Sequence, residues 1–350
     1  MYQEFEGVEI KAISACVPEN SVGNQHFSEM LSEKEIRLFE KTVGIINRRW
    51  AGDGITASDL GFHAAEMLFE KLKIDRNEIN CLIFVSQTPD YKLPFSSNIL
   101  QERLKLPKEV LCLDINAGCA GFVQGLSTAF SMAKSADKGK VLFIAAETMS
   151  KMLSQKDRGT TMLFGDGAAA IVVENTGDSK KKAFFNFFSD GANADAIIIP
   201  DGGYRSPATV ESFIAEEDEK MNVKTRLNLS MDGARVFDFT LREIGPGIKH
   251  LLEKAGKTAE EVDYFLLHQS NHFIIKQIAA QLGVSMDKMP VNIEHFGNTS
   301  GVSIPLLMVS MKAQLDQPRT MLLSGYGVGL NWANCLLENM DIQITDFKEI

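Results

Sequence analysis

The chain has 350 residues, of which 45% are hydrophobic, and its formal net charge is −10 at pH 7. This length can form two packed units of ordinary domain size. The acidic balance argues against a nucleic-acid-binding surface. No apolar stretch approaches the length of a membrane span, and the acidic, alternating N-terminus predicts a first strand and not a signal peptide. Five cysteines without a CxxC or Cys/His cluster fit a reduced, cytoplasmic protein that has no disulfide framework and no metal site.

Strands and helices are predicted to alternate along the first half. After a first strand and turn that extend to about residue 24, helical spacing is found at 27–41. An amphipathic helix with a Ser or Asp cap follows at 58–72. Short apolar runs predict buried strands, and helical or glycine-rich segments separate them. The predicted order is strand 79–86, helix 96–104, strand 110–114, strand 140–146, and a glycine turn with a strand at 162–173. This order predicts the α/β class with a largely parallel or mixed sheet.

The second half of the sequence repeats the first at an offset of about 180 residues. Three pairs of segments match in the same order: EINCLIFVSQT at 78–88 with EVDYFLLHQSN at 261–271, LPKEVLCLDINAGCAG at 106–121 with SMDKMPVNIEHFGNTSG at 285–301, and KGKVLFIAAET at 138–148 with QPRTMLLSGYG at 317–327. The repeat predicts two related α/β halves, residues 1–178 and 179–350, packed with a pseudo-twofold relation.

Two features of the second half depart from this repeat. A loop insertion is expected at about 179–228, where Gly, Pro and Asp are frequent. Helical spacing then resumes, and Pro246 is expected to kink a helix or to begin one.

Cys119 lies in the glycine-flanked turn DINAGCAGF, between a predicted strand and a helix. A sulfur at the N-terminus of a helix meets unpaired N–H groups and the positive end of the helix dipole, which favour the thiolate. A free cysteine is also often only a small buried hydrophobe. The turn alone therefore leaves both roles open.

His268 and Asn298 lie in the turns of the second half that the repeat places opposite Cys119. A lone His after a strand is more often structural, and NTSG is ordinary turn composition. Together the three residues suit a cysteine nucleophile that forms a thioester. A neutral His and an Asn amide can donate two hydrogen bonds to an enolate oxygen, such as the one formed when a malonyl thioester loses carbon dioxide.

The motifs NAGCAGF, HQSN, HFGNTSGVSIP and SGYGVGLNW resemble those of the β-ketoacyl-acyl-carrier-protein synthase III family, and MLFGDGAAA and MDGARVF resemble further segments of it. The resemblance runs from near the N-terminus to about residue 337. It implies a thiolase fold with a layered α-β-α-β-α core, a homodimer, and a decarboxylating Claisen condensation. The implied substrates are coenzyme A and phosphopantetheine thioesters, with an acyl-carrier protein as partner and no cofactor.

The resemblance also assigns roles to residues. It implies Cys119 as nucleophile, His268 and Asn298 as enolate stabilisers, and the N–H groups of Cys119 and Val328 as the oxyanion hole for the acyl-cysteine. The implied substrate-binding residues are Arg158, Asn271, Gly233, Val236, Phe237 and Leu93, the last of which would close the partner's acyl pocket.

Three positions depart from the family pattern. Leu38 stands where many members have the Trp that stacks on the coenzyme A adenine, and Thr42 stands at a nearby basic position. Phe273 replaces an Arg that helps to dock the carrier protein. The implied chemistry is thus retained, while the recognition of nucleotide and carrier differs.

Several alternatives share this fold or chemistry. A 3-hydroxy-3-methylglutaryl-CoA synthase would need a Glu acid near the cysteine, and none is close in sequence. A type III polyketide synthase shares Cys, His and Asn, so only substrates distinguish it. A non-catalytic partner subunit would commonly lack the nucleophile, and a thioesterase would need a positioned water.

Overall fold

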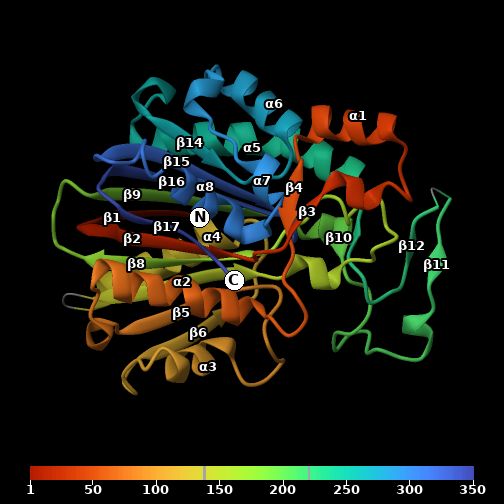
Figure 1. Cartoon of the computed structure of the whole chain (residues 1–350). Helices are drawn as coiled ribbons and strands as arrows, with labels where there is room; N and C mark the ends of the chain where they lie inside the picture. The colour runs from red at the N-terminus through yellow and green to blue at the C-terminus, as the bar shows by residue number, and fades with distance from the viewer. Residues whose placement is uncertain (137–138, 220) are drawn as a thin grey trace.

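The computed structural model describes residues 1–136, 139–219 and 221–350, which fold around two central β-sheets (Figure 1). The first sheet has six strands, in the spatial order β17 (Gln343–Glu349), β2 (Val8–Val17), β8 (Gly167–Asn175), β7 (Lys140–Glu147), β5 (Cys81–Val85) and β6 (Leu111–Ile115). The second sheet has five, in the order β1 (Tyr2–Glu6), β9 (Lys182–Ser189), β16 (Asn331–Met340), β15 (Arg319–Gly327) and β14 (Tyr264–Leu267).

Both sheets are mixed, as the sequence predicts. In the first sheet β5 pairs in parallel with β6 and β7, whereas β8 runs antiparallel to its neighbours β2 and β7. In the second sheet β14 and β15 form a parallel pair that corresponds to β5 and β7. The segment that corresponds to β6 does not form a strand, and it leads into the short helix α7 (Ile293–Phe296). The second sheet therefore ends at β14.

Helices form three layers around the two sheets. Between the sheets lie α4 (Gly121–Ser135) and α8 (Ser303–Ser310), which share one buried core with strands of both sheets. The helices α2 (Ala57–Leu72) and α3 (Ser96–Arg103) pack on the outer face of the first sheet. The helices α5 (Gly233–Ala255) and α6 (His272–Leu282) pack on the outer face of the second. The predicted α-β-α-β-α layering is confirmed.

The terminal strands are exchanged between the two sheets. β1, at the N-terminus, pairs antiparallel with β9 of the second sheet, and β17, at the C-terminus, pairs in parallel with β2 of the first. The proposed division between residues 178 and 179 falls between β8 and β9, which belong to different sheets. The exchange of β1 and β17 could not be read from the repeat.

Local capping sets the ends of the N-terminal helices. Instead of one helix at 27–41, the chain forms a short 3-10 turn, η1 (Asn24–Phe27), and then α1 (Glu33–Val43), which Ser32 and Glu35 start with a capping box. The helix α2 is capped by Thr56 and not by the predicted Ser or Asp, although Asp59 completes its capping box. Pro246 lies inside α5 and does not begin a helix.

The predicted insertion at 179–228 is shifted, because residues 182–189 form β9, a buried strand of the second sheet. The loop-rich part is residues 190–232, called here the 190–232 segment. It contains η4 (Gly191–Ala196), β10 (Ile197–Ile198), η5 (Glu211–Phe213), β11 (Glu216–Glu217), β12 (Val223–Lys224) and β13 (Ser230–Met231). β11 and β12 lie away from the two large sheets (Figure 1).

The remaining elements are short connections. They are β3 (Ser21–Gly23), which pairs with β4 (Asn47–Arg49), and the 3-10 turns η2 (Arg76–Glu78), η3 (Met149–Met152), η6 (Ala259–Glu261), η7 (Met286–Lys288) and η8 (Ser300–Val302). In the described part of the chain, no helix is both long and apolar enough to cross a membrane.

Candidate active site

The turn that carries Cys119 follows β6 and leads into α4, and strand β15 from the second half packs against it. The Cys119 turn lies so close to β15 that two positions of the strand, Gly325 and Gly327, have no room for a side chain. A Cβ atom at Gly325 would lie 2.8 Å from the Cys119 carbonyl oxygen, and a Cβ atom at Gly327 would lie 2.8 Å from the Cys119 sulfur. Glycine at these two positions lets backbone from the second half reach the sulfur directly.

Cys119, His268 and Asn298 line one cavity of about 290 Å³. Cys119 comes from the first half, whereas His268 follows β14 and Asn298 follows α7 in the second half. The structure thus brings together the three residues that the sequence places in equivalent turns. The cavity is otherwise mostly apolar, with a lining that includes Leu163, Phe164, Ile197, Met231, Thr240, Ile274 and Tyr326.

The His268 imidazole is fully buried and uncharged. Burial lowers its pKa to about 3, below the ordinary value of 6.5. Its Nδ1 lies 2.7 Å from the Ser303 hydroxyl oxygen, and the Tyr326 ring packs edge-on at a centroid distance of 5.3 Å. When the Ser303 hydroxyl donates to Nδ1, the ring proton is on Nε2, which makes that nitrogen a hydrogen-bond donor.

Backbone contacts fix the orientation of the Asn298 amide. Its Oδ1 accepts a hydrogen bond from the Ser300 N–H at 2.9 Å, which leaves the NH₂ group as the free end of the side chain. The Asn298 backbone is tied to the turn before β8, because its N–H donates to the Leu163 carbonyl at 2.8 Å. The result is a second donor on the same cavity as His268.

The Cys119 thiol is neutral in this structure. Burial raises its pKa to about 11, while the Ser300 hydroxyl, 3.6 Å from the sulfur, and the N–H groups of Val328 and Cys119 act in the opposite direction. The prediction that the helix N-terminus favours the thiolate was therefore wrong for the resting state of Cys119. The neighbouring donors do lower the pKa of the thiol, but by less than burial raises it. Burial outweighs them because a thiolate loses its solvation in the closed turn.

Val328 lies in the turn after β15, with its backbone directed at Cys119. Its N–H and the N–H of Cys119 both lower the pKa of the Cys119 thiol. The Asn331 side chain holds the turn by donating to the Val328 carbonyl at 3.1 Å. The proposed oxyanion donors are thus two neighbouring backbone N–H groups beside the nucleophile, and their catalytic role stays a prediction.

The predicted substrate-binding residues separate into two groups. Gly233, Val236, Phe237 and Asn271 line the Cys119 cavity. Arg158 and Leu93 do not line it. The Arg158 guanidinium lies 2.6 Å from a Glu35 carboxylate oxygen and borders a separate cavity of about 730 Å³ next to η1.

The side chains at the three divergent positions, Leu38, Thr42 and Phe273, are all exposed. Leu38 lies on α1, and the neighbouring turn of this helix carries Glu35, the partner of Arg158. Phe273, at the start of α6, stacks on Phe237 with a centroid distance of 5.9 Å. An apolar pair thus replaces a cation next to the cavity.

Sequence reasoning missed the residues that orient the site. Ser303 holds His268, and Ser300, whose φ is +51°, contacts the Cys119 sulfur while donating to the Gln87 Oε1 at 3.2 Å. Ser300 and Ser303 lie in the NTSGVS segment, and Tyr326 lies in SGYG. These motifs indicated that the segments belong to the site, but not which role the two serines and the tyrosine have. No motif marked Gln87.

Glu147 lies beneath the site. It is buried at the end of β7 and accepts hydrogen bonds from the Gln87 N–H and the Thr88 hydroxyl, and burial raises its pKa to about 8. It is not among the described residues that line the Cys119 cavity. The acid that a 3-hydroxy-3-methylglutaryl-CoA synthase needs is thus not presented to a substrate.

Comparisons with known proteins point to one family. The model of the 3-oxoacyl-[acyl-carrier-protein] synthase III family matches residues 113–197, and the model of its C-terminal part matches residues 252–339. The β-ketoacyl-[acyl-carrier-protein] synthase III of Streptococcus gordonii is 34% identical over 94% of this chain and 98% of its own.

Solved structures give the same result. The 3-oxoacyl-(acyl-carrier protein) synthase from Burkholderia xenovorans superposes with a TM-score of 0.93 and 35% identity, over 100% of this chain and 99% of its own. The priming β-ketosynthase of the R1128 polyketide pathway superposes with a TM-score of 0.81 and 25% identity, over 96% of this chain and 97% of its own. The fold of the chain is therefore the thiolase fold that the sequence predicted.

Proposed function

The chain belongs to the 3-oxoacyl-[acyl-carrier-protein] synthase III family, and we propose that it condenses an acyl thioester with malonyl-acyl-carrier protein to give a β-ketoacyl thioester and carbon dioxide. One observation carries the proposal. A half-buried cysteine with two backbone donors shares a single cavity with a neutral imidazole and an oriented amide. The chain is an acyl-transferring enzyme of this family.

The first half-reaction transfers the acyl group to Cys119. The sulfur attacks the thioester carbonyl, and the N–H groups of Cys119 and Val328 stabilise the negative charge on the carbonyl oxygen. The bond to the leaving sulfur then breaks, and the proton of the Cys119 thiol ends on the departing thiol. The Ser300 hydroxyl, which donates to the Gln87 Oε1 in this structure, contributes when its proton turns to the sulfur that carries negative charge.

The second half-reaction forms the new carbon–carbon bond. The malonyl thioester loses carbon dioxide, and the electron pair of the broken bond passes into an enolate whose oxygen accepts from His268 and Asn298. The enolate carbon attacks the acyl carbonyl on Cys119. When the tetrahedral intermediate collapses, the carbon–sulfur bond breaks, and Cys119 leaves as a thiolate that takes a proton from solvent. Decarboxylation generates the carbanion, so no carboxylate base is required.

The two alternatives with a different function are disfavoured. A non-catalytic subunit would not need the nucleophile, the oxyanion donors and two oriented side chains together. A type III polyketide synthase is disfavoured because this chain is 34 to 35% identical to carrier-protein synthases over nearly its whole length. The similar structures include a 3-oxoacyl-(acyl-carrier protein) synthase and the priming β-ketosynthase of a polyketide pathway, so the proposed reaction suits either setting.

We also propose a homodimer. β6 is an edge strand of the first sheet and begins with the exposed Leu111, and the loop before α3 exposes Tyr91, Leu93 and Phe95. An uncovered strand edge next to exposed apolar side chains is suited to a second copy of the chain. A stable, active monomer in analytical ultracentrifugation would refute this part.

We further propose a cytoplasmic location, which is supported by the five cysteines, all of which are free.

The proposed reaction is tested with a panel of acyl thioesters. The mass of the peptide that contains Cys119 should increase by the acyl group, and addition of malonyl-acyl-carrier protein should release carbon dioxide and remove the added mass. If no thioester acylates Cys119, or if the acyl-enzyme is only hydrolysed, the proposed function is wrong.

A further inference from the structure

The hydroxyl of Ser300 has one proton and two neighbours that can share it. Its oxygen lies 3.6 Å from the Cys119 sulfur and donates to the Gln87 Oε1 at 3.2 Å. An amide oxygen only accepts hydrogen bonds, so the Ser300 proton points to Gln87 and the thiol is left to donate to the Ser300 oxygen. Ser300 is fully buried, so bulk water does not compete for these bonds. The donors in the resting site therefore run from thiol to hydroxyl to amide.

Gln87 is fixed at both ends. It follows β5, and its backbone N–H donates to the two carboxylate oxygens of Glu147 at 3.1 and 3.2 Å. Its side-chain amide lies against the Cys119 turn, where a Cβ atom at Gly118 would be 2.6 Å from the Gln87 Oε1. Gln87 is not among the described residues that line the Cys119 cavity. The amide therefore acts on the residues around the nucleophile and not on the space that a substrate occupies.

The two roles of Ser300 lie on different atoms. Its backbone N–H donates to the Asn298 Oδ1 at 2.9 Å and orients that amide, whereas its hydroxyl lies between Cys119 and Gln87. The hydrogen bond from Ser300 to Gln87 also joins the second half of the chain to the first. A substitution at Gln87 therefore alters the hydroxyl beside the nucleophile without removing the contact that orients Asn298.

Three ionisable side chains surround the thiol. His268 stays neutral above its pKa of about 3, and burial raises the pKa of Tyr326, so neither changes its charge between pH 7 and 9.5. Glu147 does, because burial raises its pKa to about 8, and its negative charge adds to the effect of burial on the pKa of Cys119. A variant of Gln87 keeps the N–H that Glu147 accepts, so Glu147 affects variant and wild type alike. A comparison at one pH therefore isolates the amide of Gln87.

We propose that Gln87 is a positioning residue, which holds the Ser300 proton away from Cys119 so that the nucleophile rests as a neutral thiol until a thioester reaches it. As the thiol proton leaves, the sulfur becomes a better acceptor than an amide oxygen, and the Ser300 hydroxyl turns to it. The thiol proton ends on the departing thiol, as in the proposed function on which this inference rests. Once Cys119 is acylated, its sulfur carries neither proton nor charge, and the hydroxyl returns to Gln87.

This arrangement lowers the reactivity of the empty site. Alkylating agents and peroxides react with the thiolate form of cysteine and not with the thiol. Because Cys119 keeps its proton, it is spared these reactions while no acyl donor is bound. Removal of the Gln87 amide should therefore make the nucleophile more reactive toward any small electrophile.

The test is the alkylation of Cys119 by iodoacetamide from pH 7 to 9.5, followed by the mass of the peptide that contains Cys119. Gln87→Leu removes the acceptor, so the Ser300 proton is free to stabilise the thiolate. A hydrogen bond of this kind should raise the alkylation rate about threefold to tenfold at each pH. The pH profile should keep its shape and move to lower pH by about half a unit to one unit. Gln87→Met, which also lacks the amide, should give the same shift, and it replaces the leucine variant if that variant does not fold.

Two further variants decide whether the effect passes through Ser300. In Ser300→Ala the hydroxyl is gone, so adding Gln87→Leu to this variant should not change its alkylation rate. Gln281→Leu is the matched control, because the Gln281 amide also lies against a glycine, Gly245, and donates to the Leu241 carbonyl at 2.8 Å. This control should leave the pH profile of Cys119 unchanged.

The outcomes separate this inference from the proposed function. An alkylation rate of Gln87→Leu at or below that of the wild type would overturn the inference. So would an equal gain in the presence and absence of the Ser300 hydroxyl, since it would indicate a change in packing. Alkylation needs no acyl donor, so these results do not depend on the proposed reaction. That reaction would instead be refuted if no acyl thioester reacted with Cys119, whatever the alkylation rates.

Discussion

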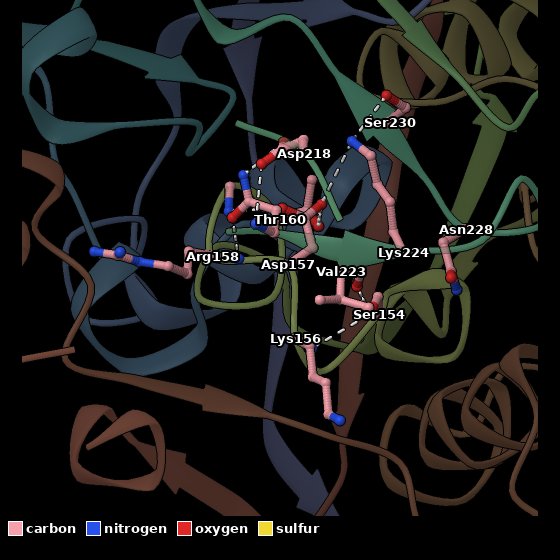
Figure 2. Close-up of polar contacts among 12 residues, drawn as sticks. Ser154, Lys156, Asp157, Arg158, Thr160, Asp218, Val223, Lys224, Asn228 and Ser230 are labelled. Carbon is pink, nitrogen blue, oxygen red and sulfur yellow. Dashed lines mark hydrogen bonds and ion pairs between the residues drawn. The ribbon is translucent and has the colours of Figure 1, made fainter. Parts of the chain in front are cut away.

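At its inner end the Cys119 cavity is formed by backbone and side chains from both halves of the chain. A neighbouring cavity of about 610 Å³, called here the outer chamber, is lined largely by residues of the 190–232 segment and the loop around Asp157. At the inner end, Gly325 and Gly327 permit contacts that no other residue would allow. At the outer chamber, hydrogen bonds hold the 190–232 segment to the loop that carries Lys156 and Arg158 (Figure 2). The proposed chemistry and the outer chamber therefore depend on different parts of the molecule, and substitutions should separate them.

The largest effect is expected at the nucleophile. Cys119→Ala should abolish both the acyl-enzyme and condensation, because no other thiol lines the cavity among the described residues. The measurement is the mass of the enzyme after exposure to acyl thioester. Cys112→Ala, on β6, is the control and should retain both activities. Condensation at the wild-type rate by Cys119→Ala would show that the nucleophile is misassigned.

Asn298→Ala should divide the two half-reactions. Loss of one preorganised donor to an oxyanion typically lowers the rate by a factor on the order of 100 to 1000. Release of labelled carbon dioxide from malonyl-acyl-carrier protein should fall by that factor, while acylation of Cys119 persists. His268→Ala should behave similarly. Normal decarboxylation together with lost acylation would reverse the roles assigned to the two sides of the site.

Ser303→Ala should have a smaller effect on the same step. It leaves His268 in place and removes the hydroxyl at Nδ1, which leaves a buried nitrogen without its partner. The cost of such a loss corresponds to a decrease in kcat of about tenfold. Decarboxylation should decrease and acylation should not. Ser303→Thr, which keeps a hydroxyl, should recover part of the rate, and an equal defect in both variants would indicate a packing role instead.

The pH dependence of alkylation tests the state of the thiol. With a pKa of about 11, the thiolate fraction of Cys119 grows as pH rises. Its reaction with iodoacetamide should therefore accelerate by about tenfold per pH unit from pH 7 to 9.5. Ser300→Ala removes a group that lowers this pKa, so it should slow alkylation a few-fold at each pH. A plateau near pH 8 would contradict the neutral resting thiol.

The smallest effect is expected for Arg158→Ala. Because Glu35 holds the guanidinium outside the outer chamber, this variant should change the acylation rate with acyl-coenzyme A by no more than about twofold. Steady-state kcat/KM with acyl-coenzyme A and with acyl-pantetheine provides the measurement. A large loss that is specific to acyl-coenzyme A would mean that Arg158 contacts the nucleotide after leaving Glu35.

The inner end was largely predictable from the sequence, and the reason is the internal repeat. Cys119 and Asn298 end equivalent segments of the two halves, so pseudo-twofold packing was enough to predict that they meet. The repeat did not show that burial governs the Cys119 pKa, since desolvation depends on atoms from distant segments. It also gave no sign that Ser303 and Gln87 orient the site.

The outer chamber was not predictable, because it has no counterpart in the first half. Loss of Trp at position 38 suggested altered nucleotide recognition. The pairing of Arg158 with Glu35 and the contacts of Asn222 with the Arg158 loop arise between segments far apart in the chain. Periodicity and turn composition describe only neighbouring residues, so they marked residues 190–228 as loop without indicating which wall these residues build.

The exchange of terminal strands has a consequence for how the chain folds. Because β1 pairs with β9 of the second half and β17 pairs with β2 of the first, the second sheet is complete only after β16 has been synthesised and the first only after β17. The first half emerges first and exposes the edge of β2 until β17 arrives, and an open edge of this kind can pair wrongly. Each half therefore depends on a strand of the other to complete its sheet, so we expect neither half to be stable alone.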